Sequence, residues 1–341
     1  MADSSPLFTG SEVVIVTGAS SGIGAVTVVR LAQRGVRKFC LTGRNEQGLQ
    51  KTKDTVIREA TKDAVFVDVL VLRKTMADSS PLFTGSEVVI VTGASSGIGA
   101  VTVVRLAQRG VRKFCLTGRN EQGLQKTKDT VIREATKDAV FVDVLGDLIE
   151  AQTAQKIVDD TIKALGRVDI LINNAGWTFG MTPIFEQSIE NFQKTFDLNL
   201  KAAVVLTKLC LPYLRESKGN VVNVSSVGSV QNYDNLSFYC MSKAALDMFT
   251  KCLASEEGKN GIRVNSVNPG FVDTRIHVKC GMPQSMVEAV IKNCANTHSV
   301  GRSGTAEEIA SMIPFLASKE CPFVSGNITM VDGGRNCYNP L

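Results

Sequence analysis

A tyrosine and a lysine four residues apart carry the clearest chemistry in this sequence. Tyr239 and Lys243 fall in a helical pattern, so this spacing places them on one face, one turn apart. A free phenol has a pKa of about 10 and exchanges protons poorly at neutral pH. Because a nearby ammonium favours the phenolate, we expect Lys243 to lower the pKa of Tyr239. The pair could then give a proton to a carbonyl oxygen or take one from an alcohol.

A serine and an asparagine upstream could assist this pair. Ser226 lies 13 residues before Tyr239, at the end of an apolar strand, where its hydroxyl can reach the sheet edge at which ligands bind. Its neighbour Ser225 is the alternative for this position. Asn199 lies in a helical stretch, where the alternative is a buried asparagine satisfied by the backbone.

The stretch Glu87–Gly99, EVVIVTGASSGIG, predicts a strand, a glycine-rich turn and a helix. In such a unit Gly93 allows the tight turn, Gly97 lets the backbone approach phosphates, and Gly99 lets the helix pack closely on the strand. The pyrophosphate of a dinucleotide binds on this kind of turn. The same letters also occur at Glu12–Gly24.

Both occurrences belong to a long internal repeat. Residues 1–70 and 76–145 are identical, and residues 71–75 join them. We interpret residues 1–75 as a partial duplicate, or an error of gene assembly, in front of a complete domain at 76–341. The duplicate carries only strand, helix, strand, helix, strand, so we expect an appended and incomplete half-sheet. In the alternative, the first copy enters the sheet and the second is displaced.

Composition limits the partners. The chain has 341 residues and a formal net charge of +5, but residues 1–75 hold 11 basic and 7 acidic residues, so the remainder is nearly neutral. That charge balance gives no basis for binding nucleic acid or anionic membranes. No secretory pattern and no apolar run of roughly 18 residues is visible, and the nine cysteines form no CxxC pairs. We expect a cytoplasmic protein with free thiols and, with only His277 and His298, no metal site.

Apolar runs alternate with amphipathic segments from Met76 onward. This alternation predicts a Rossmann-type, doubly wound parallel α/β sheet with helices on both faces. The predicted strands are Val88–Val91, Lys113–Leu116, Ala139–Leu145, Val168–Asn173, Asn220–Val224, Ile262–Val267 and Asn327–Val331.

Six motifs appear together in order. They are TGASSGIG at Thr92–Gly99, NNAG at Asn173–Gly176, Asn199 in FDLNL, Ser226 in NVSSV, Tyr239-x-x-x-Lys243 and NPG at Asn268–Gly270. On these motifs, residues 82–335 resemble the short-chain dehydrogenase/reductase family. RVNSVNPG and the final VDGG resemble its branch of 3-oxoacyl-acyl-carrier-protein reductases and carbonyl reductases.

The resemblance implies a role for each catalytic residue. Tyr239 would be the acid or base, Ser226 would hydrogen-bond the substrate oxygen, and Lys243 would also hold the nicotinamide ribose. Asn199 would hold a water that links Lys243 to solvent. The cofactor-binding residues implied are Gly93, Ser95, Ser96, Gly97, Ile98, Gly99, Arg119, Asp147, Leu148, Asn173, Ala175, Gly176, Tyr239, Lys243, Pro269, Gly270, Val272 and Thr274.

The end of the second strand of the domain bears on the choice of cofactor. Members of the family that bind NAD place an acid where this sequence has Gly118, and Arg119 follows. A guanidinium matches the oxygens of a 2′-phosphate, so NADPH is favoured over NADH. Ser96 stands at a position that is basic in some NADP-binding relatives, and Arg119 could instead be a solvated turn residue.

The favoured function is NADPH-dependent reduction of a carbonyl, of the ketone, aldehyde or 3-oxoacyl type, to a secondary alcohol. The alternatives are an NAD-dependent alcohol or steroid dehydrogenase, and a nucleotide-binding but inactive product of the duplication. Trp177, residues 227–238 and residues 275–298 should border the substrate. Met282 to Ile291 form an amphipathic pattern of a helix that could cover the site as a lid, and the alternative is that this helix packs onto the core. The resemblance implies a homotetramer or dimer through residues 201–215 and 238–255.

Overall fold

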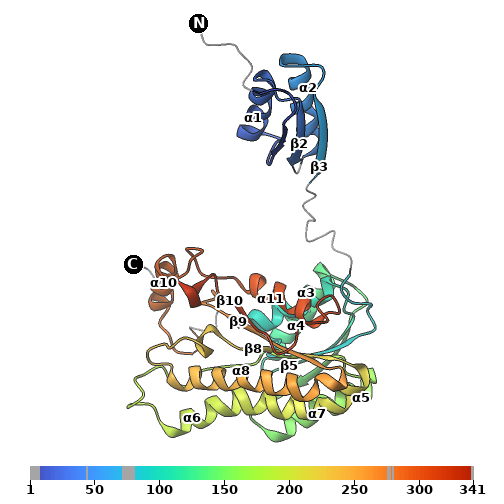
Figure 1. The fold of residues 1–341 in the computed structure, drawn as a ribbon. Helices are drawn as coiled ribbons and strands as arrows, with labels where there is room; N and C mark the ends of the chain where they lie inside the picture. The colour runs from blue at the N-terminus through green and yellow to red at the C-terminus, as the bar shows by residue number, and fades with distance from the viewer. Residues whose placement is uncertain (1–7, 44, 71–80, 275–277, 279, 339–341) are drawn as a thin grey trace. The chain divides into compact units, whose positions relative to one another are not determined.

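The computed structural model describes residues 8–43, 45–70, 81–274, 278 and 280–338. These residues fall into two units, Met1–Ser79 and Ser80–Leu341, which are described separately (Figure 1). The larger unit contains the predicted catalytic residues.

A seven-stranded parallel sheet forms the centre of the larger unit, in the order β10-β9-β8-β7-β4-β5-β6. All seven predicted strands are present, with ends within two residues of those predicted. The strands are β4 (Val88–Thr92), β5 (Lys113–Gly118), β6 (Val140–Leu145), β7 (Ile170–Asn173), β8 (Asn220–Val224), β9 (Arg263–Pro269) and β10 (Ile328–Val331). The chain order reverses between β4 and β7, and ligands of such folds bind outside the carboxyl ends of the strands at this point. The predicted doubly wound fold is confirmed.

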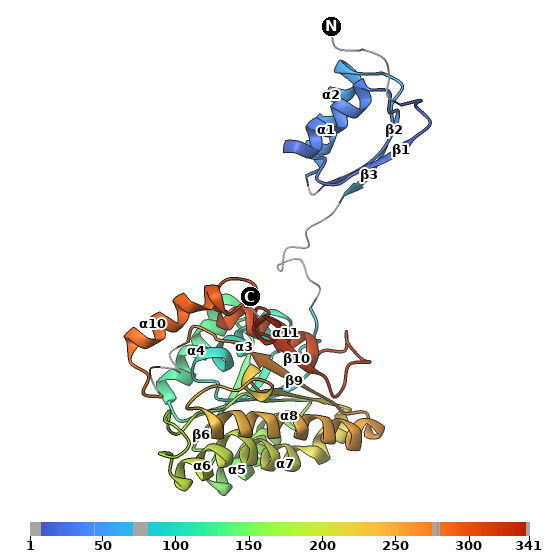
Figure 2. The same cartoon turned by 60° about the vertical axis from the view of Figure 1, so that its left-hand side comes forward.

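Helices cover both faces of this sheet (Figures 1 and 2). One face carries α3 (Gly97–Gln108), α4 (Glu121–Glu134) and α11 (Ala306–Ala317), and the other carries α5 (Ala151–Leu165), α7 (Ala202–Ser217) and α8 (Ser237–Glu257). The shorter elements are α6 (Ile189–Phe196), η1 (Asp197–Lys201), η2 (Val227–Ser229), η3 (Gly258–Asn260), α10 (Gln284–Asn293), η4 (Cys294–Asn296) and η5 (Arg335–Cys337).

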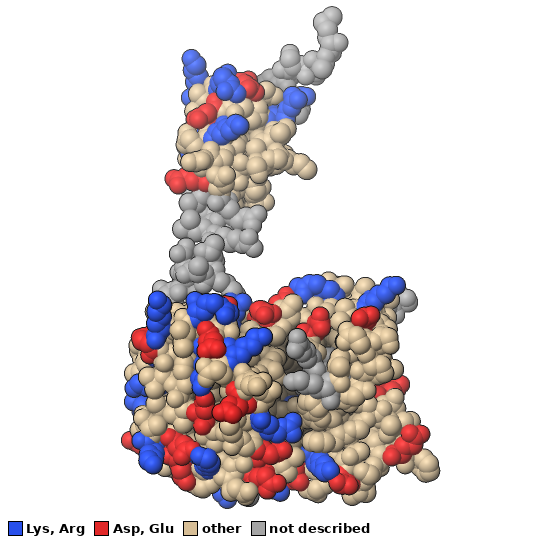
Figure 3. Space-filling model, turned by 180° about the vertical axis from the view of Figure 1, so that it is seen from behind, with Lys and Arg blue, Asp and Glu red and all other residues tan. Residues whose placement is uncertain are grey.

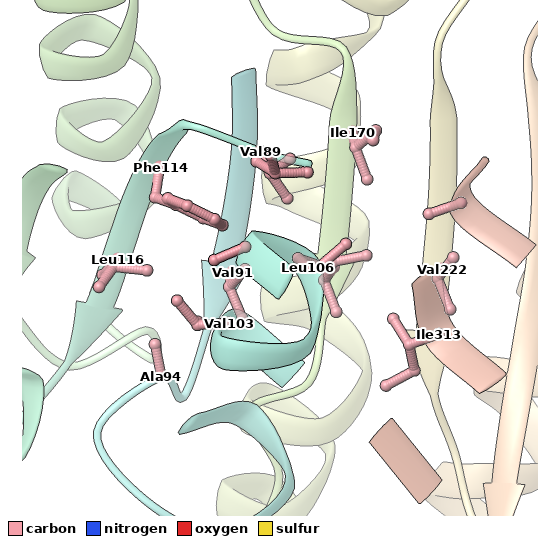
Figure 4. Close-up of a cluster of buried hydrophobic side chains, with 14 of the residues drawn as sticks. Val89, Val91, Ala94, Val103, Leu106, Phe114, Leu116, Ile170, Val222 and Ile313 are labelled. Atoms are coloured by element: carbon pink, nitrogen blue, oxygen red, sulfur yellow. The ribbon is translucent and has the colours of Figure 1, made fainter. Parts of the chain in front are cut away.

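Two apolar layers hold the sheet between these helices. Because side chains alternate along a strand, Val89 and Val91 of β4 pack toward α3 and α11, while Ile90 packs toward α5 and α7. Figure 4 shows the first layer, where Leu106 of α3 lies among strand residues. The whole of β4 is buried, so the turn that follows it starts from a rigid base.

The smaller unit has a three-stranded parallel sheet in the order β1-β2-β3. Its elements are β1 (Val13–Val16), α1 (Gly22–Gln33), β2 (Lys38–Gly43), α2 (Glu46–Glu59) and β3 (Val65–Leu70). Val13 and Ile15 are 67% and 69% exposed, whereas their counterparts Val88 and Ile90 are fully buried. Burying such a side chain stabilises a fold by about 1.5–3 kcal/mol. The same local sequence thus gains much less in the smaller unit, whose described residues include no counterpart of α5 and α7 to cover this face of the sheet.

Candidate active site

The glycine-rich turn follows β4 at the carboxyl edge of the sheet. Gly93 and Gly97 have φ of +65° and +58°, the left-handed region that favours glycine. A Cβ on Gly97 would meet nothing within 4 Å, so the turn leaves room for a ligand beside its backbone. A Cβ on Gly99 would lie 2.4 Å from the Gly93 carbonyl oxygen, so this close approach of α3 requires glycine.

Helix α3 presents its N-terminus at this turn. Among the residues that the structure describes, no side chain caps its first turn, which leaves backbone N–H groups available. The end of a helix that carries these groups favours a negatively charged ligand. Ser95, Ser96 and Ile98 lie in this segment, so the turn fits the pyrophosphate of a dinucleotide.

Asn174 fixes the same turn and is absent from the predicted site. Its Nδ2 donates to the Thr92 carbonyl at 2.8 Å and to the Gly93 carbonyl at 3.4 Å. The Thr92 hydroxyl oxygen accepts from the backbone N–H groups of Asn174 and Ala175, each at 2.9 Å. The turn is therefore tied to the end of β7, more than 80 residues away. In the sequence, the only indication of this role is that Asn174 is the second Asn of the NNAG motif.

Asn173, the first residue of that motif, turns its side chain into the core. Its Nδ2 donates to Thr207 Oγ1 at 3.0 Å and to Asn223 Oδ1 at 2.9 Å. Only its backbone can therefore line a cofactor. A small hollow beside it is also lined by Leu148 and Ala175, two further predicted residues.

Tyr239 and Ser226 lie together where β8 and α8 meet. A Cβ added to Gly228 would lie 3.3 Å from Ser226 Oγ and 3.5 Å from Tyr239 Cε1, so both groups border one small space. Burial raises the pKa of Tyr239 to about 12, and a hydrogen bond with Ser226 partly opposes this rise. Lys243 is not among the groups that most affect this pKa. The predicted lowering is wrong, because the hydration that the phenolate loses on burial outweighs the help of its neighbours.

The choice between the two serines is clear in the structure. Ser225 Oγ donates to the Lys243 carbonyl at 3.2 Å, inside the interface between β8 and α8. Ser226 Oγ instead accepts from the Gly228 N–H at 3.0 Å and faces Tyr239. Ser226 is therefore the serine placed to meet a substrate.

Lys243 is 3% exposed and donates from Nζ to the Val224 carbonyl at 2.9 Å. Its Nζ lies 5.8 Å from the centre of the Tyr239 ring. Burial lowers the pKa of Lys243 to about 8, and the negative charge of Asp247 partly opposes this fall. The ammonium is thus present at neutral pH in a poorly hydrated place.

Asn199 lies in η1, a π-helical turn between α6 and α7. Its side chain accepts from the Trp177 N–H and donates to the Trp177 carbonyl, each at 2.8 Å, and it also donates to Ser242 Oγ at 3.0 Å. A Cβ on Gly176 would lie 3.1 Å from Lys243 Nζ and 3.4 Å from Asn199 Oδ1. Gly176 thus leaves the space that both groups border.

Arg119 and Asp147 meet at the ends of β5 and β6. Arg119 Nη1 lies 3.4 Å from Asp147 Oδ2, and its guanidinium lies 6.0 Å from the centre of the Trp177 ring. A Cβ on Gly118 would lie 3.0 Å from Ser95 Oγ, so an acidic side chain there would crowd the glycine-rich turn. Arg119 and Asp147, the two residues expected to bind the adenosine end of the cofactor, are therefore neighbours.

The segment after β9 contributes the last predicted residues. The Asn268 side chain donates to the Ser226 carbonyl at 3.0 Å, and a Cβ on Gly270 would lie 2.8 Å from Asp332 Cα. Pro269 ends β9, and Val272 is buried in a bridge with Gly304. Asp273, Thr274, Val278, Gln284 and Val287 line an open hollow.

Helix α10 begins one residue after Pro283 and buries Val287, as the lid pattern predicts, whereas Met286 is exposed. Arg275 and His277 lie outside the described residues.

Within the described part of the chain, no group of three or more His, Cys, Asp or Glu side chains could hold a metal ion. None of the described helices combines the length and apolar character needed to cross a membrane.

Comparisons with known proteins agree with this arrangement. The sequence profile described as enoyl-(acyl carrier protein) reductase matches residues 93–336, and the short chain dehydrogenase profile matches residues 12–79. The chain belongs to the short-chain dehydrogenase/reductase family. An L-fucose dehydrogenase of Mus musculus is 33% identical over 73% of this chain and 88% of its own length. A 3-oxoacyl-acyl-carrier-protein reductase of Thermotoga maritima is 32% identical over 73% of this chain and 97% of its own length.

Solved structures of family members also match. A short-chain dehydrogenase/reductase of unknown function from Caenorhabditis elegans, crystallised with cofactor, has a TM-score of 0.70 and 34% identity over 75% of this chain and 97% of its own. Levodione reductase has a TM-score of 0.70 and 30% identity over 75% of this chain and all of its own. The protein is thus an NAD(P)-dependent oxidoreductase that acts on a small molecule.

Proposed function

We propose that the protein reduces a carbonyl compound to a secondary alcohol with NADPH. The observation that carries this proposal is the convergence of four groups at one end of the sheet. Ser226 and Tyr239 border the space beside Gly228, and Lys243 and Asn199 border the space beside Gly176. At neutral pH the Tyr239 phenol is protonated, and this is the form that can donate to a carbonyl oxygen during reduction.

Each residue then has a distinct task. Ser226 orients the carbonyl oxygen by a hydrogen bond, and Tyr239 donates the proton that this oxygen takes up. The reduced nicotinamide, when bound, supplies the hydride. Lys243 would hold the nicotinamide ribose, as the family resemblance implies, and Asn199 holds the polar path by which the proton is replaced. The residues for the dinucleotide are the predicted set, with Asn174 holding their turn.

The preference for NADPH rests on the end of β5. Gly118 has no carboxylate for ribose hydroxyls, and Arg119 is a guanidinium whose side chain is 58% exposed and thus accessible to a phosphate. Asp147 is its only ion-pair partner within 4 Å among the described residues. A 2′-phosphate could take the same position beside the guanidinium.

The test compares kcat/KM for NADPH and NADH with a panel of ketones and 3-oxoacyl thioesters. We expect the ratio to favour NADPH in the natural chain. In Arg119→Ala we expect kcat/KM for NADPH to fall by about tenfold or more, because a charge-assisted hydrogen bond contributes about 1.5–3 kcal/mol, while NADH is affected little. A natural chain that prefers NADH would contradict the cofactor assignment.

A second function is oxidation of an alcohol with NAD. Relatives named L-fucose dehydrogenase and 7alpha-hydroxysteroid dehydrogenase favour it. An inactive, nucleotide-binding chain is the third outcome. Turnover of secondary alcohols with NAD at a higher kcat/KM than carbonyls with NADPH would support the second function, and cofactor binding without turnover of either class would support the third.

We propose that residues 76–341 are the complete catalytic domain and that residues 1–75 are an appended partial copy. Seven strands and the four catalytic groups in the larger unit support this division. We also propose a cytoplasmic homotetramer or dimer formed through α7 and α8, where Met241 and Met248 are 47% and 57% exposed. A chain beginning at Met76 should be as active and stable as the whole, and loss of NADPH binding would contradict the division.

A further inference from the structure

A buried carboxylate lies behind the catalytic lysine. Asp247 is four residues after Lys243 in α8, so the two side chains occupy the same helix face one turn apart. Asp247 is only 7% exposed. A charged side chain that is this deeply buried needs partners, and those partners indicate what it does.

The carboxylate is held by hydrogen bonds from β9. Oδ2 accepts from Asn268 Nδ2 at 2.7 Å, and Oδ1 lies 3.2 Å from Ser266 Oγ, whose single hydrogen is shared with Asn268 Oδ1. Neither of these two partners is charged. The same Asn268 Nδ2 also lies 3.0 Å from the Ser226 carbonyl oxygen and 2.8 Å from Ser229 Oγ, so its two hydrogens are shared among these three acceptors. Asp247 is thus tied to the backbone of the catalytic serine.

The other charges around Lys243 are few or already paired. On its own helix, Lys243 has Tyr239 and Asp247 as titratable neighbours, with Cys240 beside Tyr239. The sequences of β7, β8 and η2 contain no charged residue. The helices and strands packed nearby contribute the charged side chains Asp197 and Lys201 of η1, Glu190 and Lys194 of α6, and Arg263 of β9. The thiol of Cys280 also raises the pKa of Tyr239.

These remaining charges have partners of their own. Asp197 pairs with Lys201, Glu190 pairs with Lys194, and Arg263 donates to the Leu316 and Ser318 carbonyls. Asp247 is therefore the carboxylate placed to act on Lys243. In an interior of low dielectric constant, a neighbouring negative charge favours the protonated form of a lysine.

We propose that Asp247 is a positioning residue that keeps Lys243 protonated in the working pH range and, through Asn268, fixes the Ser226 backbone. This inference rests on the catalytic role of Lys243 in the proposed function. The direction of the pKa effect of Asp247 on Lys243 agrees with it. Without the carboxylate, burial would lower the pKa of Lys243 and the negative charge of Asp247 would no longer oppose it.

Asp247→Asn tests the charge while keeping the contacts. The new amide oxygen can accept from Asn268 Nδ2, and the new amide nitrogen can donate to Ser266 Oγ, which still donates to Asn268 Oδ1. The pKa of Lys243 is followed by NMR of ¹³C-labelled lysine, with Lys243→Arg for assignment. We expect this pKa to fall by about one unit, and the alkaline limb of kcat/KM for carbonyl reduction to move to lower pH by the same amount.

Glu257→Gln is the matched control. Glu257 is a buried carboxylate of the same helix, 5% exposed and paired with Arg215, but it lies 14 residues from Lys243, about 21 Å along the axis. In this variant we expect neither the pKa of Lys243 nor the alkaline limb of the pH profile of kcat/KM to move. Asp247→Glu should restore the natural pH profile even where it lowers kcat.

The outcomes separate the inference from the function on which it rests. An unchanged Lys243 pKa in Asp247→Asn overturns the inference. A lowered pKa with an unmoved activity limb supports the inference and overturns the catalytic role of Lys243. If Asp247→Asn does not fold, Asp247→Ser, whose hydroxyl can accept from Asn268, is titrated in the same way with the same two decisive results.

Discussion

Replacing Lys243 with methionine should stabilise the protein while it abolishes turnover. Burial lowers the pKa of this lysine from 10.5 to about 8, which corresponds to roughly 3 kcal/mol of unfavourable free energy for the buried ammonium. Methionine has a similar length and no charge. The variant loses the hydrogen bond to the Val224 carbonyl, worth about 1 kcal/mol. We therefore expect the free energy of unfolding to rise by about 2 kcal/mol at pH 7.

The pH dependence of this gain has a definite sign. Below pH 8 the lysine is protonated in both the folded and the unfolded state, so its full penalty is present. Between pH 8 and 10.5 the unfolded chain binds more protons than the folded one, so the stability contributed by this group rises with pH. The advantage of Lys243→Met should therefore shrink as pH rises and disappear near pH 10.5.

Urea unfolding followed by tryptophan fluorescence measures this gain in the full chain. The sequence has a single tryptophan, Trp177, which lies in the larger unit, so unfolding of the smaller unit does not contribute directly. Natural chain and variant are compared at one protein concentration at pH 7 and pH 10. A variant less stable than the natural chain at pH 7, with the same pH dependence, would refute the reasoning.

Two further predictions concern the glycine-rich turn. Gly99→Ala should abolish NADPH binding, because its Cβ would lie 2.4 Å from both Asn174 Nδ2 and the Gly93 carbonyl, whereas Gly24→Ala, the same change in the identical first copy, should leave binding unchanged in a fluorescence titration. Asn174→Ala should weaken NADPH binding about tenfold and lower the free energy of unfolding by about 1–2 kcal/mol, because it removes the hydrogen bonds from Nδ2 to the turn. Loss of binding in Gly24→Ala, or natural affinity in Asn174→Ala, would contradict these roles.

The strands of the larger unit could be predicted because burial on both faces leaves an unmistakable pattern. Ile170–Asn173 and Asn220–Val224 are buried along their whole length, and six of their nine residues are Ile, Leu or Val. Helix α11 also follows local rules, since Thr305 and Glu308 form a capping box at its start. Such features depend on residues that are close together in the chain, so they can be predicted from a single sequence.

Contacts between distant segments could not be predicted in the same way. Asn174 binds the Thr92 carbonyl from 82 residues away, and Asp247 meets Asn268 only because α8 packs on β9. The pKa of Tyr239 was predicted from one neighbour, although burial by the whole site decides its direction. Burial also separates the two identical copies, because Ile15 is exposed and Ile90 is buried with the same residues around them in sequence.

Charge is mixed over the face of the larger unit that Figure 3 shows. Figure 3 shows basic and acidic side chains interspersed on the face drawn there, as the nearly neutral composition of residues 76–341 predicts. A surface of this kind offers no extended field of one sign to attract a polyanion. Recognition of the cofactor phosphates therefore depends on local groups such as Arg119 and the N-terminus of α3.

Replacement of the tyrosine hydroxyl tests the central claim most directly. In Tyr239→Phe we expect kcat for carbonyl reduction to fall by about 10²–10⁴-fold, the usual contribution of a positioned acid, while the Kd for NADPH stays within about twofold. Tyr338→Phe, one residue after η5 and outside the predicted site, is the matched control and should keep most of kcat. A Tyr239→Phe protein that reduces its carbonyl substrate within tenfold of the natural rate would contradict the account.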